Sequence, residues 1–137
     1  EALLPLAAAL DRLPPGVKEK IGEKGTVNVN NYSKGLDGNR SGFYFHPTTD
    51  EPATLLPDGV ATEPTFYTPN VWPDDAMPEL KERARRAAPF LVDVGLELAK
   101  SIDRHLVSKF GPQIQEDSSL VKLAGHAKNC NHKCRLL

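Results

Sequence analysis

The sequence has few cysteines and no long apolar run. Its only cysteines are Cys130 and Cys134, and two thiols so close together do not make the disulfide framework of a small secreted domain. No apolar stretch approaches the roughly 18 residues that a membrane-spanning helix needs. These absences predict a reducing compartment and no membrane partner, so the expected location is cytoplasmic.

An excess of charge of either sign is also lacking. Lys and Arg together number 17 and Asp and Glu 18, so the formal net charge is −1. Such a chain has no field to steer a nucleic acid, and no nucleic-acid partner is expected. A glycine-rich phosphate loop, a nucleophile elbow and an H-E-x-x-H metal motif are absent as well. The sequence thus predicts no catalytic residue from a local motif.

One long amphipathic helix is the strongest pattern present. Pro78 and Glu79 suit a first helical turn with Asp75 as its N-cap, because a fixed φ and a negative charge favour that end. Apolar residues then recur every three or four positions, at Leu80, Ala84, Ala87, Leu91, Val94, Leu98, Ile102, Leu106 and Phe110. The predicted helix spans 78–110, ends at Gly111, and is expected to kink at Pro89.

Shorter elements surround this helix. Leucines spaced three and four apart predict a first helix over 2–13, and the aromatic run 42–46 predicts a strand. Val27 and Val29 suggest a second, weaker strand. Seven of the twelve prolines fall within 47–78, which excludes regular helix and indicates an irregular connection. The expected fold class is α+β, mainly helical, with one long kinked helix and one or two short strands.

The end of the chain predicts a short helix and a cluster of possible metal ligands. Asp117 or Ser118 could cap a helix that uses the apolar residues near 120–124. Nitrogen and sulfur ligands of the kind that zinc prefers then follow at His126, Cys130, His132 and Cys134. Four ligands on one short peptide would strain a tetrahedral site. Buried thiols and exposed imidazoles are the alternative interpretation.

Other titratable residues suit a catalytic role less well. His46 and Asp50 would suit an iron-binding triad only if one residue separated them, as in His-x-Asp, but three intervene. Asp93, Asp103 and His105 fall on the flank of the apolar stripe of the long helix, so a solvated surface is expected for them.

Four segments, in order, resemble the isopenicillin N synthase-like family. They are residues 41–47 (SGFYFHP), 69–73 (PNVWP), 77–81 (MPELK) and 93–100 (DVGLELAK), and the resemblance extends over roughly residues 10–137. In that family this order is an aromatic strand, a proline-rich crossing, an Asn-Val-Trp-Pro element and a long helix. Residues 134–137 (CRLL) resemble the start of the first strand of the family's catalytic barrel.

The resemblance implies that residues 1–137 are a single, partial N-terminal region that packs on a missing jelly-roll barrel. The parent would be an oxidoreductase, a non-haem Fe(II)/2-oxoglutarate dioxygenase acting on a small-molecule substrate. This chain alone would bind no cofactor, because the family's His-x-Asp, distal His and Arg-x-Ser are not in it. It would contribute scaffold and a substrate-facing lip formed by Tyr32, Lys34, Tyr44 and Phe45.

Two other functions stay open. The chain could be a stand-alone, non-enzymatic interaction protein that docks through the amphipathic helix 78–110. It could also be a small zinc-binding module centred on residues 126–134, which would bind zinc stoichiometrically and unfold with a chelator.

Overall fold

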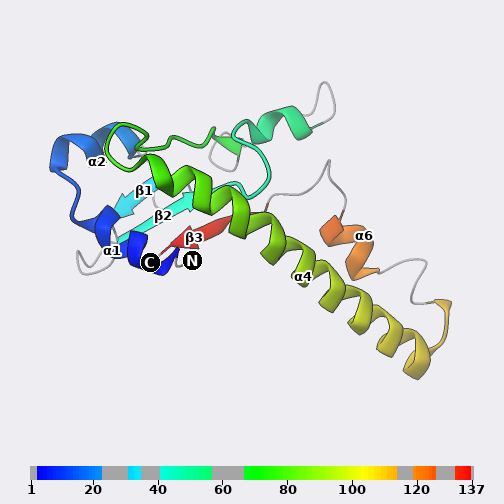
Figure 1. The fold of residues 1–137 in the computed structure, drawn as a ribbon. Helices are drawn as coiled ribbons and strands as arrows, with labels where there is room; N and C mark the ends of the chain where they lie inside the picture. The colour runs from blue at the N-terminus through cyan, green and yellow to red at the C-terminus, as the bar shows by residue number, and fades with distance from the viewer. Residues whose placement is uncertain are drawn as a thin grey trace.

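The computed structural model describes residues 3–22, 31–34, 41–56, 67–113, 119–125 and 132–136. These residues form an α+β fold in which a small antiparallel sheet lies beside one long helix and several short helices (Figure 1). The predicted fold class is therefore confirmed at this level. None of the described helices combines the length and the apolar composition needed to span a membrane.

The sheet has three strands in the order β1-β2-β3, namely Asn31–Lys34, Ser41–Phe45 and Cys134–Leu136. β2 is the predicted aromatic strand and lies in the middle. β1 falls in a polar segment for which no strand was predicted, and β3 falls within residues 134–137, the segment that resembles the start of a strand. The weak strand predicted at Val27 and Val29 lies outside the described residues. The described residues thus contain three strands, whereas one or two short strands were predicted.

The short helices are α1 (Leu4–Asp11), α2 (Pro15–Ile21) and α6 (Leu120–Gly125), and a 3-10 turn, η1, covers Pro52–Leu55. Pro14 is extended, with φ −55° and ψ 146°, and Pro15 occupies the first turn of α2, where its missing N–H costs nothing. The η1 turn is the only helical turn between 47 and 56. That part of the proline-rich connection is otherwise irregular, as expected.

The long helix α4 spans Pro78–Phe110, which confirms the predicted bounds. Its N-cap is Met77 rather than Asp75, and no side chain caps it. The helix continues through Pro89, which lacks the N–H that would bond to the turn before it. Gly111 ends the helix with φ +98°, a conformation that L side chains rarely adopt.

The core lies between one face of the sheet and the first half of α4. Phe43 and Leu80 are completely buried there, and α1 closes the cluster with Leu6 and Leu10. The small residues Ala84 and Ala88 let α4 approach the sheet closely. Beyond them α4 extends away from the sheet and carries α6 alongside its second half (Figure 1). Only the first half of the predicted apolar stripe is therefore buried.

Candidate functional site

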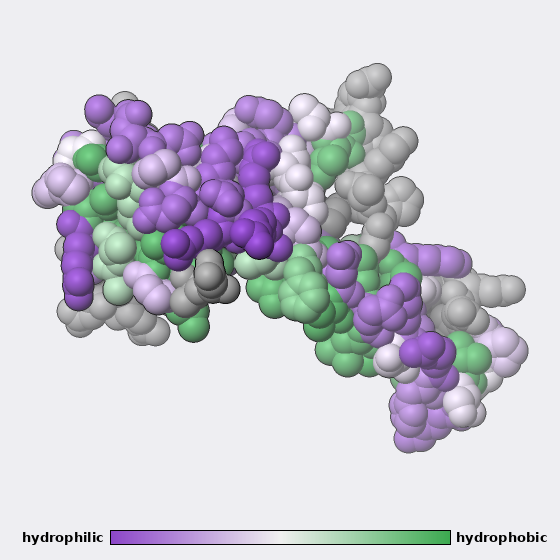
Figure 2. Space-filling view, viewed as in Figure 1, coloured by the Kyte–Doolittle hydropathy of each residue, from purple (hydrophilic) through white to green (hydrophobic). Residues whose placement is uncertain are grey.

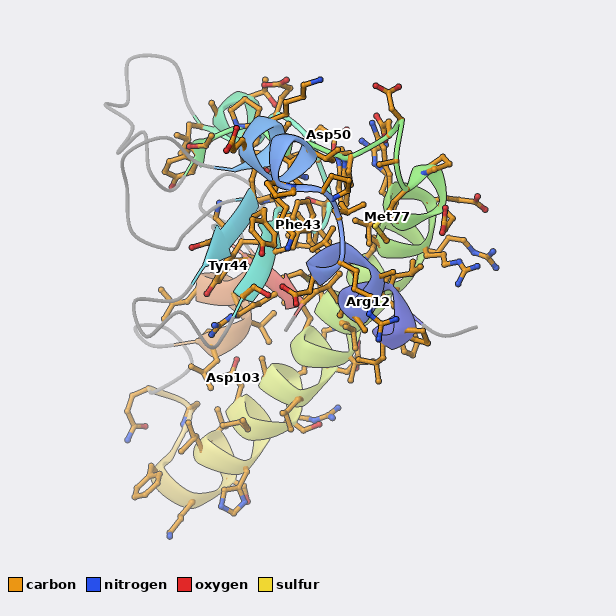
Figure 3. All side chains as sticks on the ribbon, turned by 90° about the vertical axis from the view of Figure 1, so that its left-hand side faces the viewer. Arg12, Phe43, Tyr44, Asp50, Met77 and Asp103 are labelled. Atoms are coloured by element: carbon orange, nitrogen blue, oxygen red, sulfur yellow. The ribbon has the colours of Figure 1, made fainter. Side chains whose placement is uncertain are left out.

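The four residues predicted to form a substrate-facing lip lie on two paired strands but not on one surface. Asn31 pairs with Tyr44, and Tyr32 pairs with Phe43. Side chains alternate across a sheet, so Tyr44 faces away from the core while Phe43 faces into it (Figure 3), and Phe45 belongs to the core as well. Phe45 is 2% exposed and lies 5.2 Å from the Trp72 ring. The structure does not bring Phe45 and Tyr44 to a common site.

Tyr32 contacts the first two helices. Its hydroxyl donates a hydrogen bond to Asp11 Oδ1 at 3.4 Å, and Lys18 Nζ lies 5.3 Å from the ring centroid. Ser41 Oγ also donates to Asp11, at 2.7 Å. These contacts fasten α1 and α2 to the sheet. Lys34 pairs with Ser41 at the other end of β1, so it lies two positions along the strand from Tyr32.

The Asn-Val-Trp-Pro segment is fastened by two side-chain amides. Asn70 Oδ1 accepts from the backbone N–H of His46 at 2.7 Å, and Asn70 Nδ2 donates to the carbonyls of His46 and Thr49, each at 3.0 Å. From β1, Asn31 Oδ1 accepts from Val71 N–H at 2.8 Å and Nδ2 donates to Pro69 O at 3.3 Å. The amides replace the ladder partners that a proline-rich segment cannot supply.

Asp50 joins this segment to α4. Its Oδ1 accepts from Trp72 Nε1 at 2.8 Å and from Asn70 Nδ2 at 3.2 Å. Its Oδ2 lies 3.1 Å from Lys81 Nζ and accepts from Arg85. Partial burial by itself would raise the pKa of Asp50, but the bonds from Trp72, Asn70 and Lys81 and the charge of Arg85 outweigh it, so the pKa is lowered. Asp50 is a structural anion.

His46 has a structural position too. It is 2% exposed, and its Nδ1 accepts from the backbone N–H groups of Thr48 and Thr49, each at 3.3 Å. In the neutral ring the proton is therefore on Nε2. The carboxylate of Asp50 is engaged by four donors, so both residues have structural hydrogen bonds in this fold.

From Phe90 onward α4 carries an apolar surface, the distal stripe, which no described residue covers. Its members are 39–65% exposed, and they are Phe90, Leu91, Val94, Leu98 and Ile102. Figure 2 shows apolar residues gathered along this part of the molecule, next to the more hydrophilic surface around the start of α4. An apolar surface of this kind usually marks a contact with another body.

A shallow groove of about 320 Å³ lies beside this stripe, where α4 meets α6 and the start of β3. Leu91, Leu96 and Ala124 contribute apolar walls, and Cys134 lies at its end. Burial raises the pKa of the Cys134 thiol, so the sulfur is protonated at neutral pH and is a poor nucleophile. The groove has the character of a packing surface rather than a reactive site.

Asp103 was expected on a solvated face, and that prediction is wrong. It is 7% exposed and caps α6 from the neighbouring helix. Its Oδ2 accepts from Val121 N–H at 3.1 Å and its Oδ1 from Leu120 N–H at 2.9 Å, while Ser119 Oγ donates to it at 2.8 Å. Those two backbone bonds, with the weaker contribution of Ser119, lower the pKa of Asp103 despite its burial.

The helix cap of α6 also differs from the prediction. Ser119 precedes the helix, and its hydroxyl accepts from Lys122 N–H at 3.3 Å, which is the geometry of an N-cap. The predicted caps, Asp117 and Ser118, lie outside the described residues. Asp93 and His105 are exposed on α4, as expected.

Two of the four possible zinc ligands, His126 and Cys130, lie outside the described residues. His132 Nε2 lies 3.0 Å from the carbonyl oxygen of Ala124, and Cys134 pairs with Phe45 in the sheet. Within the described ranges, no three His, Cys, Asp or Glu residues come together as a metal site. The zinc interpretation stays a prediction.

Sequence reasoning did not identify Arg135 as a surface residue of interest. Arg135 pairs with Tyr44 across the sheet, and its guanidinium carbon lies 5.1 Å from the centroid of the Tyr44 ring. The sequence signal that could have identified it is the alternation in residues 134–136, which places Arg135 on one face of a strand and Cys134 and Leu136 on the other.

Comparisons of the chain with protein-family models, with curated proteins and with solved structures gave no match.

Proposed function

We propose that this chain is the N-terminal scaffold region of an isopenicillin N synthase-like oxygenase. The parent enzyme would use Fe(II), dioxygen and 2-oxoglutarate to oxidise a small molecule. The observation that carries the proposal is the distal stripe on α4, whose Leu91, Val94 and Leu98 are 49–61% exposed although the residues of α4 that face the sheet, from Leu80 to Ala88, are buried. This difference in exposure is expected if the start of α4 covers the sheet of this region and the distal stripe packs against a catalytic barrel.

The roles of the residues in the Asn-Val-Trp-Pro segment support the proposal. Asn70 and Trp72 both reach Asp50, which also binds Lys81 and Arg85 of α4. The segment therefore fixes where the long helix starts relative to the aromatic strand. A scaffold needs this function, because a barrel packed on α4 would be positioned by the orientation of that helix.

In this proposal the chain supplies no metal ligand. Asp50, His46 and Asp103 are each engaged in structural hydrogen bonds. Iron would activate dioxygen in the barrel, at the family's His-x-Asp and distal His, while this region orients the barrel and shields its outer surface from water.

The test begins with the coding sequence downstream of Leu137, read for His-x-Asp, a distal His and Arg-x-Ser in that order. The polypeptide it encodes is then titrated anaerobically with Fe(II) and 2-oxoglutarate, and the charge-transfer absorption of the ternary complex is recorded. Finding the three motifs and the absorption is the expected result. A stop codon directly after Leu137 would overturn the proposal.

A matched pair of variants tests the docking surface in the same polypeptide. Leu98→Lys places a charge in the distal stripe, whereas Asp93→Asn makes the same change in net charge on the polar side of α4. We expect Leu98→Lys to lower the melting temperature of the barrel and Asp93→Asn to leave it unchanged. Equal effects would argue against barrel packing through the distal stripe.

The charge pattern beside the distal stripe favours a second candidate, a stand-alone interaction protein that self-associates. Asp93 and Glu97 precede Lys100 and Arg104 along α4. A second copy lying antiparallel would therefore place acids opposite bases while the stripes pack together. Sedimentation of the 137-residue chain distinguishes the two, because self-association requires a dimer that Leu98→Lys disrupts.

A further inference from the structure

Tyr44 and Arg135 form a polar pair on the face of the sheet that looks away from the core. They are cross-strand partners on β2 and β3, and the guanidinium lies over the ring at 5.1 Å. Phe43 and Phe45, on either side of Tyr44, both point into the core toward Trp72. In Figure 3 the labels of Phe43 and Tyr44 mark these two directions, with Met77 of the helical layer beyond Phe43.

Both side chains have hydrogen-bonding capacity to spare. Within the described ranges Arg135 makes no ion pair or hydrogen bond, and its contact with the Tyr44 ring is its only polar interaction. The Tyr44 hydroxyl likewise has no hydrogen-bond partner among these residues. A guanidinium that stacks on a ring keeps its N–H groups directed outward in its own plane, so stacking orients the donors without using them.

Gly42 makes room for this stack. A Cβ at Gly42 would lie 3.2 Å from Arg135 Nε and 3.3 Å from Tyr44 Cε2, closer than side chains normally allow. The absence of a side chain at Gly42 therefore leaves room for Arg135 Nε and the edge of the Tyr44 ring beside the strand.

We propose that Arg135 and Tyr44 bind the carboxylate of a small organic acid. The guanidinium offers a planar fork that matches the two oxygens of a carboxylate, and the phenol adds a neutral donor beside it. The described residues that share this face are uncharged apart from Arg135, namely Asn31, Ser33, Gly42 and Tyr44. Among the described strand residues of this face, an anion would therefore meet one cation, Arg135, and no carboxylate.

The site goes beyond the scaffold role. Carboxylate binding by Arg135 and Tyr44 does not depend on the proposed oxygenase function. Only the further assignment of that carboxylate to the enzyme's substrate rests on it. Phosphate shares the affinity of carboxylate for guanidinium, and the experiment separates the two anions.

The test is a titration of the 137-residue chain, followed by the amide resonances of Gly42, Tyr44 and Arg135. The probes are benzoate, the neutral isostere benzamide, and inorganic phosphate. We expect benzoate to shift these resonances and benzamide to leave them in place. The variant Arg135→Gln should raise the benzoate Kd roughly tenfold or more, since it removes a charge-assisted hydrogen bond.

Further variants separate the contributions. Tyr44→Phe keeps the ring and loses the hydroxyl, so Kd should rise less than in Arg135→Gln. Arg135→Lys keeps the charge without the fork and should bind with intermediate affinity. Arg104→Gln removes an exposed arginine of α4 and should leave Kd unchanged. The titration contains no iron or 2-oxoglutarate, so its outcome is independent of the oxygenase proposal. A failure to bind benzoate would not contradict the oxygenase proposal, and a failure of the oxygenase proposal would not contradict benzoate binding.

Three outcomes would overturn the inference. The first is an unchanged benzoate Kd in Arg135→Gln, in a protein whose circular dichroism matches that of the parent chain. The second is equal shifts with benzamide and benzoate. The third is tighter binding of phosphate than of benzoate, which would reassign the pair to phosphate.

Discussion

The carboxylate of Asp103 on α4 accepts a hydrogen bond from the hydroxyl of Ser119 at 2.8 Å, across 16 positions of sequence. Through this contact the second half of the long helix holds the start of α6 in place. Asp103 also accepts from the first two backbone N–H groups of α6, and Ser119 caps the third. Both residues therefore act on the helix end at which backbone donors lack partners.

We predict that removing either group loosens α6. Ser119→Ala should cost about 1 kcal/mol in the free energy of unfolding, the usual loss for an N-cap. Asp103→Ala should speed amide hydrogen exchange at Leu120 and Val121, because these N–H groups lose their acceptor. Asp93→Ala, an exposed carboxylate on the same helix, is the control and should not change that exchange. Unchanged exchange in Asp103→Ala would show that the cap is dispensable.

We predict that Asp50→Ala destabilises the junction between the Asn-Val-Trp-Pro segment and α4. The change leaves Trp72 Nε1 without its acceptor and two cations without their partner, while Asn70 Nδ2 keeps the carbonyls of His46 and Thr49. Because the site is partly open to water, the expected loss is about 1–2 kcal/mol in denaturant unfolding. Asp74→Ala, at an exposed position nearby, should have no measurable effect. A loss no larger than that of Asp74→Ala would contradict the role of Asp50.

The same carboxylate predicts how stability depends on acid. The pKa of Asp50 in the folded chain lies below its ordinary value of 3.8. Ionised Asp50 thus contributes stability above that value, and the contribution is lost as the pH falls through the lower, folded pKa. Fluorescence of Trp72, the single tryptophan, is a suitable probe of unfolding at each pH. Asp50→Asn should flatten the pH dependence below about pH 4, and an unaltered slope would refute the assignment.

The two halves of α4 should respond differently to truncation. Leu80 is completely buried, so Leu80→Ala should cost about 2–5 kcal/mol. Leu98 is 61% exposed, so Leu98→Ala in the isolated chain should change the free energy of unfolding by less than about 0.5 kcal/mol. Thermal or urea unfolding of the two variants makes the comparison. Equal costs would mean that the distal stripe is covered in solution.

The sequence predicted α4 well, because a long run of apolar residues at helical spacing, with Pro78 at its start and Gly111 at its end, leaves little choice of structure. It predicted β2 for a similar reason, since aromatic residues gather there between turn formers. The pattern could not show which part of the stripe would be buried. Burial depends on where the sheet ends beneath α4, which is a tertiary property.

The missed elements depend on distant partners. β1 is a polar segment that becomes a strand by pairing with β2 and through the amide of Asn31, whose φ of +52° is tolerated better by asparagine than by most residues. Asp103 looks like a surface residue until α6 folds back onto α4. Of the predicted lip, Tyr44 faces outward and Phe45 faces the core, because neighbouring residues of a strand point to opposite faces of the sheet. The prediction placed both on one surface and so ignored this alternation.

The place of β3 in the sheet has a consequence for the order of folding. β2 is the middle strand, yet one of its two neighbours, β3, follows it in the sequence only after α4 and α6. During synthesis, the edge of β2 that pairs with β3 therefore has no strand partner until α4 and α6 have been made. Such a long-range pairing is slow, and an uncovered strand can join a neighbouring chain. We therefore expect this region to be most prone to aggregation before β3 has paired with β2.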